Sequence, residues 1–459
     1  MSLVRQDPEL ERPIDDLSQL TDYFRRAEKP RERWRIGTEH EKVGLYADTL
    51  DPVPYEGPRG IRRLLEILRD EHGFEALVDE GLLVGLERDG TTITLEPGGQ
   101  LELSGAPLLT MFETCGEFRD HLALMKHVSS RLGILWLGLG IHPRDPVERV
   151  PRMPRKRHEI MRRFLAPRGK LAPAMMHQTA CVQANLDYAS PLDMARKLRV
   201  ATAISPIVTA LYANSSISLG RPNGFESKRA FIWRHTDPAR CGILPFVFEE
   251  DFLESGRAYQ AYADWALDIP MMMLQRGEEH LALDGRTFRV FVEQGYEGLE
   301  PILADWHLHL TTLFPEVRLK RVIEVRGADG VPPDLVCALS AFWKGILYDP
   351  VALDATLERV APWSFEAVDR MHEDVARRGL SAAGPAGEVL AEARALLPPA
   401  AEGLQRIGIR NAEGRDESLL LDPLFEIAER GTSPGREIVR LWEGAWGQKL
   451  ERLVEYARY

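Results

Sequence analysis

Apolar side chains recur every three or four positions along several long segments of the chain. Residues 56–72 show this helical pattern most clearly. Ile61, Leu64 and Leu68 fall on one side of the expected helix, and Gly73 marks its expected end. The same spacing predicts further helices over residues 8–29, 108–132, 190–213 and 305–314.

Shorter segments alternate between apolar and polar residues, which is the pattern of a strand with one buried face. Residues 91–105 contain two such runs separated by Pro97, Gly98 and Gly99, so we expect a hairpin there. The run at 134–140 is apolar and predicts a buried strand. Further alternating segments predict strands over residues 35–46, 179–188 and 317–326.

The composition changes beyond residue 349, where Ala, Leu, Glu and Arg dominate and helical spacing replaces alternation. We find no repeat of fixed period and no linker that divides the chain. We therefore expect a single domain over residues 1–459, with residues 349–459 mainly helical. Strands early and in the middle, with helices between and after them, predict an α+β fold.

Composition and charge narrow the classes of function. The chain has 459 residues, 44% of them hydrophobic, so it can bury a large core. Its 70 acidic and 58 basic residues give a formal charge of −12, which disfavours nucleic acid and anionic lipid as general partners. The longest apolar run, at 134–141, is far shorter than the ~18 residues of a membrane span, and residues 1–10 show no secretory signal. We expect a soluble protein without nucleic-acid or membrane partners.

The four cysteines, Cys115, Cys181, Cys241 and Cys337, stand far apart in the sequence. They show no CxxC spacing, and they are too few to staple a chain of this length. We therefore expect four buried thiols and a reducing, cytoplasmic location.

The alternating segments carry unusually charged polar faces. Side chains two positions apart in a strand point the same way, so Glu39 and Glu41 share a face, as do Gln183 and Asn185. A wet face on an antiparallel sheet would explain any one of these strands by itself. Four strands together present a set of acids, amides and cations: Glu39, Glu41, Glu96, Glu102 and Glu324; Gln183 and Asn185; Arg318, Lys320 and Arg326.

These acids need compensation if they meet on one sheet. Two carboxylates 4 Å apart repel each other by about 4 kcal/mol at an effective dielectric constant of 20, so the acids must be dispersed, protonated or neutralised. Carboxylates and amides without paired Cys or His suit a hard cation, most often Mg²⁺ that also contacts substrate phosphates. Arg and Lys beside them suit phosphate oxygens. The pattern predicts a site for Mg²⁺ and a nucleotide.

The common nucleotide and hydrolase motifs are absent from the sequence. It contains no GxxxxGKS/T, no GxGxxG before a helix, no kinase set, no HExxH and no GxSxG. Residues 40–44 begin like HExxH but lack the second histidine, so His40 is expected to be a structural residue. Spacing alone therefore predicts Mg²⁺-dependent phosphate chemistry and goes no further.

Several short strings follow one another along nearly the whole chain. The main ones are GTEHEK at 37–42, LEPGGQLELSG at 95–105, CVQANLDY at 181–188, GRPNGF at 220–225, LPFVF at 244–248, LDIPM at 267–271, HLTTLFPEVRLKRVIEVRGADG at 309–330 and EGAWGQ at 443–448. In these strings the sequence resembles the plant-type and proteobacterial glutamate-cysteine ligases, whose catalytic sheet is similar to that of glutamine synthetase. The resemblance implies a six-stranded antiparallel catalytic sheet with helices on its outer side.

The resemblance also implies a reaction. ATP would phosphorylate the side-chain carboxylate of L-glutamate, and the amine of L-cysteine would attack the acyl phosphate. The products would be γ-glutamylcysteine, ADP and phosphate, the first step of glutathione biosynthesis. This agrees with the predicted Mg²⁺ site, because metal ions neutralise charge on a transferred phosphoryl group.

The family's site residues map onto this chain in four groups. The implied Mg²⁺ ligands are Glu39, Glu41, Glu96, Glu102 and Glu324, and Gln183 and Asn185 would orient metal or nucleotide. Arg318, Lys320 and Arg326 would face the phosphates as catalytic groups. Arg229 and Arg234 would clamp the α-carboxylate of glutamate.

The sequence departs from the family at residues 178–181. Relatives commonly have Arg where this chain has Gln178, and Cys where it has Ala180. The cysteine is displaced to Cys181, on the face of Gln183 and Asn185, and residues 281–300 contain none. A thiol-disulfide switch is therefore not expected, and Gln178 could affect the choice of amine.

Alternatives remain open at this point. A sister ligase could join glutamate to another amine, a hydrolase could use the same Mg²⁺ site on phosphate esters, and a scaffold protein could have lost the chemistry. The oligomeric state is expected to be a monomer or a homodimer.

Overall fold

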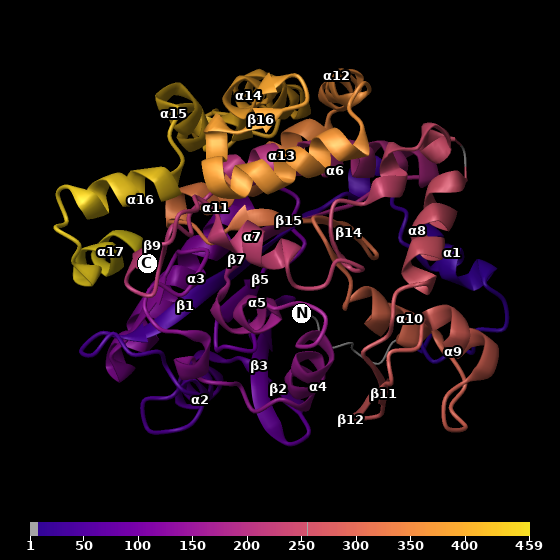
Figure 1. The fold of residues 1–459 in the computed structure, drawn as a ribbon, viewed down its shortest axis with the longest axis horizontal. Helices are drawn as coiled ribbons and strands as arrows, with labels where there is room; N and C mark the ends of the chain where they lie inside the picture. Colours follow the sequence, from indigo (N-terminus) through magenta and orange to yellow (C-terminus); the bar gives the residue numbers. More distant parts are fainter. Residues whose placement is uncertain (1–7, 255) are drawn as a thin grey trace.

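The computed structural model describes residues 8–254 and 256–459 of the chain (Figure 1). Its centre is an antiparallel sheet. The strands of this sheet are β1 (Ile36–Tyr46), β2 (Glu75–Asp79), β3 (Leu82–Arg88), β4 (Thr91–Leu95), β5 (Leu101–Ser104), β6 (Ile134–Leu137), β7 (Cys181–Leu186), β14 (Val317–Leu319) and β15 (Ile323–Asp329). They are ordered β14-β15-β7-β1-β5-β4-β3-β2, and β6 pairs with the second half of β1.

The expected α+β fold with a large antiparallel sheet is confirmed, but the sheet is wider than the resemblance implied. Within the described residues it holds nine strands rather than six. Strands β2 and β3 were not expected from the sequence; β2 is largely exposed and shows no regular alternation. The strand expected over 317–326 is instead a hairpin of β14 and β15, in which Arg318 lies directly opposite Glu324.

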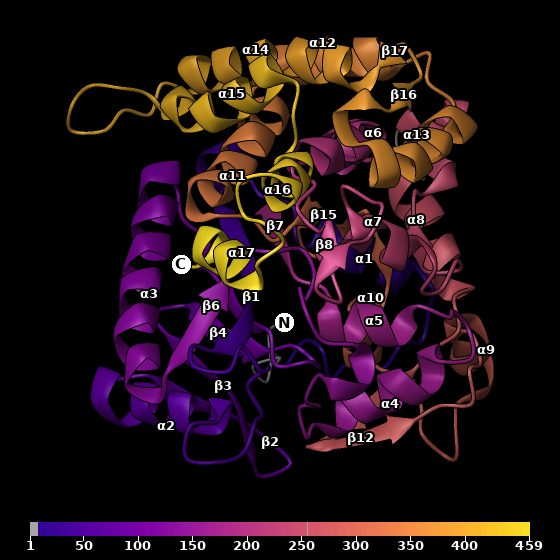
Figure 2. The ribbon, with the colours of Figure 1, turned by 60° about the vertical axis from the view of Figure 1, so that its left-hand side comes forward.

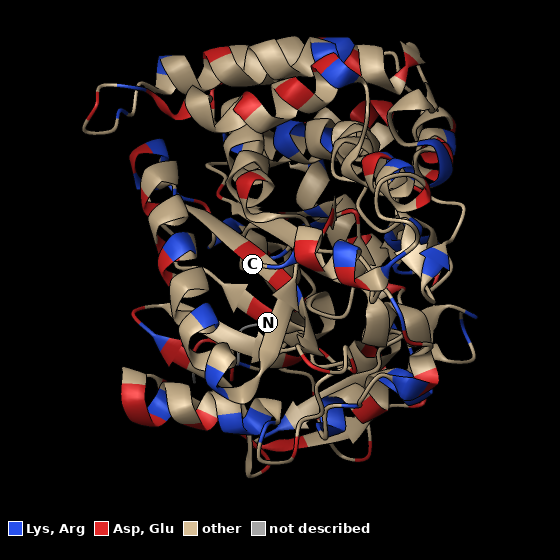
Figure 3. Cartoon of the chain, turned by 90° about the vertical axis from the view of Figure 1, so that its left-hand side faces the viewer, with Lys and Arg blue, Asp and Glu red and all other residues tan. Residues whose placement is uncertain are grey.

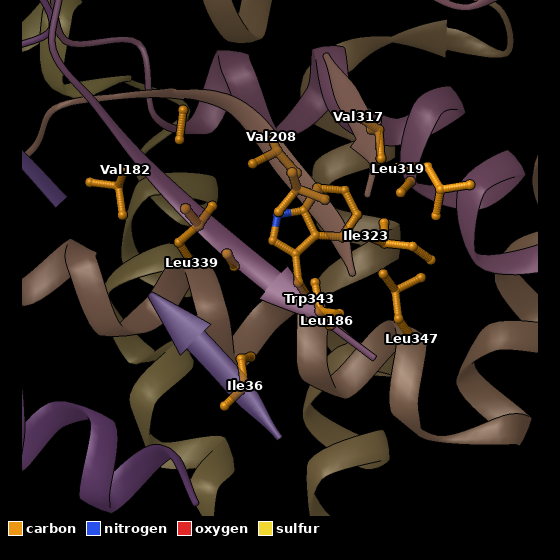
Figure 4. Packing of buried hydrophobic residues seen from close by; sticks show 14 of the residues in the cluster. Ile36, Val182, Leu186, Val208, Val317, Leu319, Ile323, Leu339, Trp343 and Leu347 are labelled. Atoms are coloured by element: carbon orange, nitrogen blue, oxygen red, sulfur yellow. The ribbon is translucent and has the colours of Figure 1, made fainter. Parts of the chain in front are cut away.

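One face of the sheet packs on two long helices, α6 (Pro191–Leu211) and α11 (Pro333–Tyr348). Val182 and Leu186 of β7 lie in this layer together with Trp343 of α11, which is 1% exposed (Figure 4). Because successive side chains of a strand point to opposite faces, Gln183 and Asn185 lie on the other face. The apolar layer therefore fixes which side of the sheet carries the polar residues.

Two further helices agree with the sequence analysis. α3 (Met111–Leu132) runs beside β1 and β6, and α2 (Ile61–His72) packs against it (Figure 2). A capping box of Thr110 and Glu113 starts α3. The α2 helix ends at Gly73, whose φ of 71° is the left-handed conformation that glycine adopts easily.

Shorter elements lie over the polar face of the sheet and along its edge. The helices are α1 (Ser18–Arg25), α4 (Lys156–Leu165), α5 (Ala172–Gln178), α7 (Lys228–Arg234), α8 (Arg257–Leu267), α9 (Phe288–Gln294) and α10 (Leu303–Leu310). The short strand pairs are β8 (Ile217–Ser218) with β9 (Arg221–Pro222), β10 (Cys241–Gly242) with β13 (Phe314–Pro315), and β11 (Met273–Arg276) with β12 (Glu279–Ala282). The helix expected over 8–29 is thus confined to α1.

The chain beyond residue 349 is mainly helical, shown in orange and yellow in Figure 1. It contains α12 (Pro350–Val360), α13 (Phe365–Arg378), α14 (Val389–Ile407), α15 (Asp422–Arg430), α16 (Pro434–Glu443) and α17 (Leu450–Ala457), with one small hairpin of β16 (Ala383–Gly384) and β17 (Gly387–Glu388). Helices α12, α13 and α14 pack on α6, so they form a layer behind it. Among the described residues no single helix is long and apolar enough to cross a membrane; α11 and α12 together pass that test but are bent by 88°.

The expectation of four free thiols is wrong. Cys115 of α3 and Cys337 of α11 form a disulfide, with their Cα atoms 5.9 Å apart. The two residues are 222 positions apart in the sequence, and the packing of α3 against α11 brings them together. No spacing in the sequence indicates such a pair. Cys181 and Cys241 are free thiols.

Candidate active site

A cavity of about 640 Å³ lies between the polar face of the sheet and helices α4, α5, α7 and α10. The sheet side carries the acids and cations, and the helices supply the opposite wall. Most of the site residues expected from the sequence line this cavity: Glu39, Glu41, Glu96, Glu102, Glu324, Gln183, Arg318, Lys320 and Arg326.

Strand register brings the acids together. Glu41 of β1 lies directly opposite Glu102 of β5, and Glu39 lies between Gln183 of β7 and Ser104 of β5. The carboxylate of Glu39 accepts a hydrogen bond from Asn185 Nδ2 at 2.8 Å. Figure 3 shows acidic residues as red segments on the central strands. The acids therefore lie side by side across neighbouring strands of the sheet.

Burial and mutual repulsion disfavour the charged form of these acids. Burial, followed by Glu96 and Glu102, raises the pKa of Glu41 to about 8. Burial, followed by Glu102, raises the pKa of Glu96 to about 7. The pKa of Glu39 is also raised, by burial first and then by the charges of its acidic neighbours. A proton or a cation in the cavity would relieve this repulsion.

Glu324 differs from the other acids because three cations surround it. Its carboxylate accepts hydrogen bonds from Arg318 Nη2 at 3.0 Å, Lys320 Nζ at 3.2 Å and Arg326 Nη1 at 3.2 Å. Burial alone would raise the pKa of Glu324, but these three cations outweigh burial and hold it well below its ordinary value. The expected metal ligand is therefore the centre of an ion-pair network in this structure.

The three cations of this network have different further contacts. Arg318 also donates to the carbonyl oxygens of Thr311 and Leu313, both at 3.0 Å, and so ties β14 to the segment after α10. Arg326 donates to Gln183 Oε1 at 2.6 Å. Arg326 therefore links the cation network to Gln183, which lies beside Glu39 on the neighbouring strand.

The donors that line the cavity are carboxylate and amide oxygens. Within residues 8–254 and 256–459, no three Asp, Glu, His or Cys side chains lie close enough together to hold one metal ion. The donors are nevertheless the oxygen ligands of a hard cation, and pairs such as Glu41 and Glu102 face a common cavity. Mg²⁺ is commonly held by one or two carboxylates together with water and substrate phosphates. The residues fit such a partly protein-bound ion and do not form a closed cage.

The two residues expected to bind the glutamate α-carboxylate, Arg229 and Arg234, lie outside the cavity lining. Arg234 forms a bidentate pair with Asp369 of α13, with Nη2 2.7 Å from Oδ2. Arg229 donates to the backbone carbonyl of Arg326 at 2.8 Å. The residue of α7 that does line the cavity is Trp233. Gln178 also lies outside the cavity lining, and its side chain donates to the carbonyl of Asp145.

The expected orientation of Cys181 agrees with the structure. Its Sγ donates to Glu41 Oε1 at 3.2 Å and accepts from Gln183 Nε2 at 3.3 Å. The residue is only 3% exposed, and burial raises the pKa of the thiol well above its ordinary value. Cys181 is therefore a protonated group packed beneath the acids.

The apolar wall of the cavity was not expected from the sequence. Three methionines and two aromatic rings form it: Met161, Met175, Met176, Trp233 and Phe314. They come from different helices and from β13, so no single segment showed a pattern. His307 was also missed; its Nδ1 is 2.6 Å from the hydroxyl of Tyr23, and the ring lines the cavity. Only the long-range packing of α4, α5, α7 and α10 brings these residues together.

The chain is similar to known proteins over nearly its whole length. The chain matches the family described as Glutamate-cysteine ligase family 2 (GCS2) over residues 35–456. A chloroplastic glutamate–cysteine ligase from Solanum lycopersicum is 40% identical over 443 residues, which cover 96% of this chain and 82% of that protein. Chloroplastic glutamate–cysteine ligase B from Oryza sativa subsp. japonica is 40% identical over 434 residues, or 94% and 85% of the two chains. These chloroplastic relatives contradict the cytoplasmic location expected from the cysteines.

A solved structure shows the same fold at lower sequence identity. Glutamate–cysteine ligase from Francisella tularensis, in complex with AMP, superposes with a TM-score of 0.53 and 13% identity, covering 92% of this chain and 88% of that chain. Because the family match covers residues 35–456 and the plant relatives share 40% identity over nearly the whole chain, this protein belongs to the glutamate-cysteine ligase family.

Proposed function

We propose that this protein joins the γ-carboxylate of L-glutamate to the amine of L-cysteine, with ATP as co-substrate, and forms γ-glutamylcysteine, ADP and phosphate. The observation that carries the proposal is the single cavity in which a row of buried acids lies beside a cation network, through the Gln183–Arg326 hydrogen bond. The family relationship supports the same reaction. We further propose that residues 1–459 act as one catalytic domain.

Two transfers make up the reaction. A γ-carboxylate oxygen of glutamate attacks the γ-phosphorus of ATP, and ADP leaves. The cysteine nitrogen then attacks the acyl carbon, phosphate leaves with the bonding electron pair, and the nitrogen loses a proton. Phosphorylation is needed because a carboxylate has no good leaving group. Both steps place negative charge on phosphoryl oxygens, which fixed cations stabilise.

Each side of the cavity has a role in this proposal. Mg²⁺, which would neutralise the phosphates, would be held by Glu39, Glu41, Glu96 and Glu102. Burial and neighbouring acids raise the pKa values of Glu39, Glu41 and Glu96, so a bound cation would relieve the repulsion among them. Arg326 and Lys320 would turn from Glu324 toward the transferred phosphoryl group. Arg318 would stay with Glu324, because its Nη1 donates to two backbone carbonyls, and would position that carboxylate.

The wall opposite the sheet favours cysteine over polar amines. Methionine sulfur and aromatic rings make a soft, apolar surface that suits a thiol or a short alkyl group. Met161, Met175, Met176, Trp233 and Phe314 form this wall, and none of their side chains carries a charge. A sister ligase with a charged amine substrate is therefore the weaker candidate.

The direct test is the release of ADP and phosphate from ATP with glutamate, with and without an amine. Cysteine and 2-aminobutyrate should give fast turnover and a product of the mass of a γ-glutamyl dipeptide, whereas lysine and aspartate should not. Phosphate release at the same rate without an amine would show a hydrolase and overturn the proposal. Fast turnover with a charged amine would instead assign the sister ligase activity.

A further inference from the structure

A chain of hydrogen bonds crosses the active-site face of the sheet from Arg326 to Glu41. Arg326 Nη1 donates to Gln183 Oε1 at 2.6 Å, and Gln183 Nε2 donates to Cys181 Sγ at 3.3 Å. Cys181 Sγ in turn donates to Glu41 Oε1 at 3.2 Å. The chain runs over the neighbouring strands β15, β7 and β1. It therefore joins the cation network around Glu324 to one of the acids proposed to hold Mg²⁺.

Arg326 sets the direction of every bond in this chain. A guanidinium group donates hydrogen bonds and accepts none, so the side-chain oxygen of Gln183 must face Arg326. The amide nitrogen of Gln183 then faces Cys181 and donates to its sulfur. The thiol hydrogen is left for the carboxylate of Glu41, which accepts it. The donors and acceptors of all four side chains are thus mutually consistent.

Cys181 contacts both oxygens of the Glu41 carboxylate. Its backbone N–H donates to Oε2 at 2.9 Å, while its thiol donates to Oε1. The pairing of β1 with β7 ends at His40 and Val182, and Glu41 and Cys181 are the next residues beyond it, so this N–H can bind a side chain. Two contacts restrict rotation of the carboxylate. Because a carboxylate has about four acceptor sites, about two remain for a cation in the cavity.

The surroundings of Cys181 differ from those of a thiol that only fills space. A free cysteine is commonly a small buried hydrophobe, and Cys241 fits this description because it packs beside an apolar cluster. Cys181 is 3% exposed, yet its sulfur contacts two polar side chains, Glu41 and Gln183. Cys181 does not line the cavity, whereas both of these partners do. Any effect of Cys181 on the reaction therefore passes through them.

We propose that Cys181 is a positioning residue of the active site, which fixes the carboxylate of Glu41 and couples it, through Gln183, to Arg326. The metal-binding acid and the phosphate-facing cation are then held in one geometry before substrates bind. Groups that orient a metal ligand contribute roughly 10–100-fold to metal affinity or activity. The role of Cys181 in turnover rests on the proposed ligase function, whereas its effect on cation binding does not.

Binding of Mn²⁺, a paramagnetic substitute for Mg²⁺, tests this role on the full-length protein without turnover. Electron paramagnetic resonance measures the free ion. We expect Cys181→Ala to weaken Mn²⁺ binding by roughly tenfold or more, because Glu41 loses one of its two donors. Cys181→Ser keeps a donor and an acceptor and should recover most of the affinity. Cys241→Ala removes the other free thiol and should change nothing. Equal Mn²⁺ affinity of the wild-type protein and Cys181→Ala would overturn the proposal.

A second pair of variants keeps the test valid if Cys181→Ala fails to fold. Threonine and valine have nearly the same shape and both suit a strand, but only threonine can donate to Glu41. Cys181→Thr should therefore bind Mn²⁺ more tightly than Cys181→Val, again by roughly tenfold. Equal affinities in this pair would show that the side chain at this position only fills space.

A double-mutant cycle on kcat tests the coupling to Arg326. If Cys181 and Arg326 act through one chain of hydrogen bonds, the double variant Cys181→Ala/Arg326→Ala should lose less activity than the product of the two single losses. Losses that simply multiply would reject the coupling. Absence of ADP release from the wild-type protein with glutamate and cysteine would reject the ligase function instead, and the Mn²⁺ comparison would still decide whether Cys181 positions Glu41.

Discussion

Glu41 and Glu102 lie directly opposite each other on β1 and β5, and both carboxylates face the active-site cavity. Nearby Glu96 adds a third acid, and burial together with Glu96 and Glu102 raises the pKa of Glu41 to about 8. The protein therefore folds around a set of acids that is favourable only when a proton or a cation neutralises part of it.

Without divalent cations, we expect Glu41 and Glu96 to contribute a free energy of unfolding that falls as the pH rises from about 5 to about 8. The unfolded chain releases the protons of these two acids near the ordinary pKa of 4.5, but the folded protein holds them to about 8 and about 7, so for these groups the unfolded chain binds fewer protons over the interval. Buried histidines with lowered pKa values, such as His142 and His177, contribute with the opposite sign below about pH 6.5, so the contribution of the acids is measured as a difference between variants. Urea unfolding in EDTA at several pH values measures the slope.

Glu41→Gln should remove the largest falling contribution from this pH dependence, because Glu41 is the acid with the higher pKa. The exposed Glu443→Gln is the matched control and should leave the slope unchanged. Adding Mg²⁺ at pH 8 should restore stability to the wild-type protein and less to Glu41→Gln. Identical slopes in Glu41→Gln and Glu443→Gln would show that the acid row does not control the pH dependence.

Removing single acids from the row should separate activity from folding. Glu39→Gln and Glu102→Gln keep the side-chain shape but remove a charge that would hold Mg²⁺, so we expect kcat to fall by about 10² or more. The Mg²⁺ concentration at half-maximal activity should rise in both variants. Circular dichroism should show unchanged secondary structure. Wild-type activity in both variants would contradict the proposed metal site.

Replacing Glu324 should lower the stability of the fold, whereas replacing Glu39 or Glu41 should not. Because Arg318, Lys320 and Arg326 all contact it, Glu324→Gln leaves buried cations without their partner. We expect the free energy of unfolding to fall by about 3 kcal/mol, the range for breaking a buried ion pair. Chemical denaturation at pH 7 measures this. A more stable Glu324→Gln protein would mean that Glu324 belongs with the repelling acids.

Arg326 should matter to turnover more than to folding. Arg326→Ala removes the hydrogen bond to Gln183, but Glu324 keeps Arg318 and Lys320. We expect kcat to fall by about 10² or more with little change in the unfolding midpoint. Arg326→Lys should recover only part of kcat, because a point charge does not reproduce the planar guanidinium fork. Normal ATP turnover in both variants would remove Arg326 from the mechanism.

Thiol counting tests the cysteine assignments. The unfolded protein should show two reactive thiols without reductant, Cys181 and Cys241, and four after reduction. In the folded protein Cys181 should react slowly because it is buried and its pKa is raised. Reduction should lower the free energy of unfolding by about 2–5 kcal/mol, since the disulfide closes a long loop. Four thiols without reductant would contradict the Cys115–Cys337 pair.

The parts of the fold and site that were predictable are those with local signals. The alternation around Glu39 and Glu41 gave both the strand and the face, and Pro97 to Gly99 gave the hairpin. The turn after Lys320 was missed because VRLKRVIEVR contains no glycine or proline, and the alternation is interrupted only at Arg321 and Val322. Long-range contacts set that turn: Leu319 N–H donates to the hydroxyl of Tyr262.

The unexpected partners of Arg229 and Arg234 have the same explanation: they are set by long-range contacts. The sequence places Arg234 beside a loop. It does not indicate that Asp369 of α13 packs against this side chain and pairs with it. The apolar cavity wall, the disulfide and the partners of Glu324 all join segments far apart in the chain. The strands and the faces of their side chains were therefore predictable from local pattern, whereas the partners of those side chains were not.

β1 carries charge on both faces, with Glu39 and Glu41 toward one cavity and His40 and Lys42 toward the other side. Hydrophobic patterning alone fixes the register of such a strand only weakly, and a slip by one residue would keep a full hydrogen-bond ladder while inverting the charge of the catalytic face. The flat contact of Trp136 on Gly44 prevents this error, because a slip would bring a Cβ into the space of the indole ring. Gly44 thus helps to fix the register of β1. Replacing it with a larger residue would produce molecules with native-like secondary structure and an inactive catalytic site.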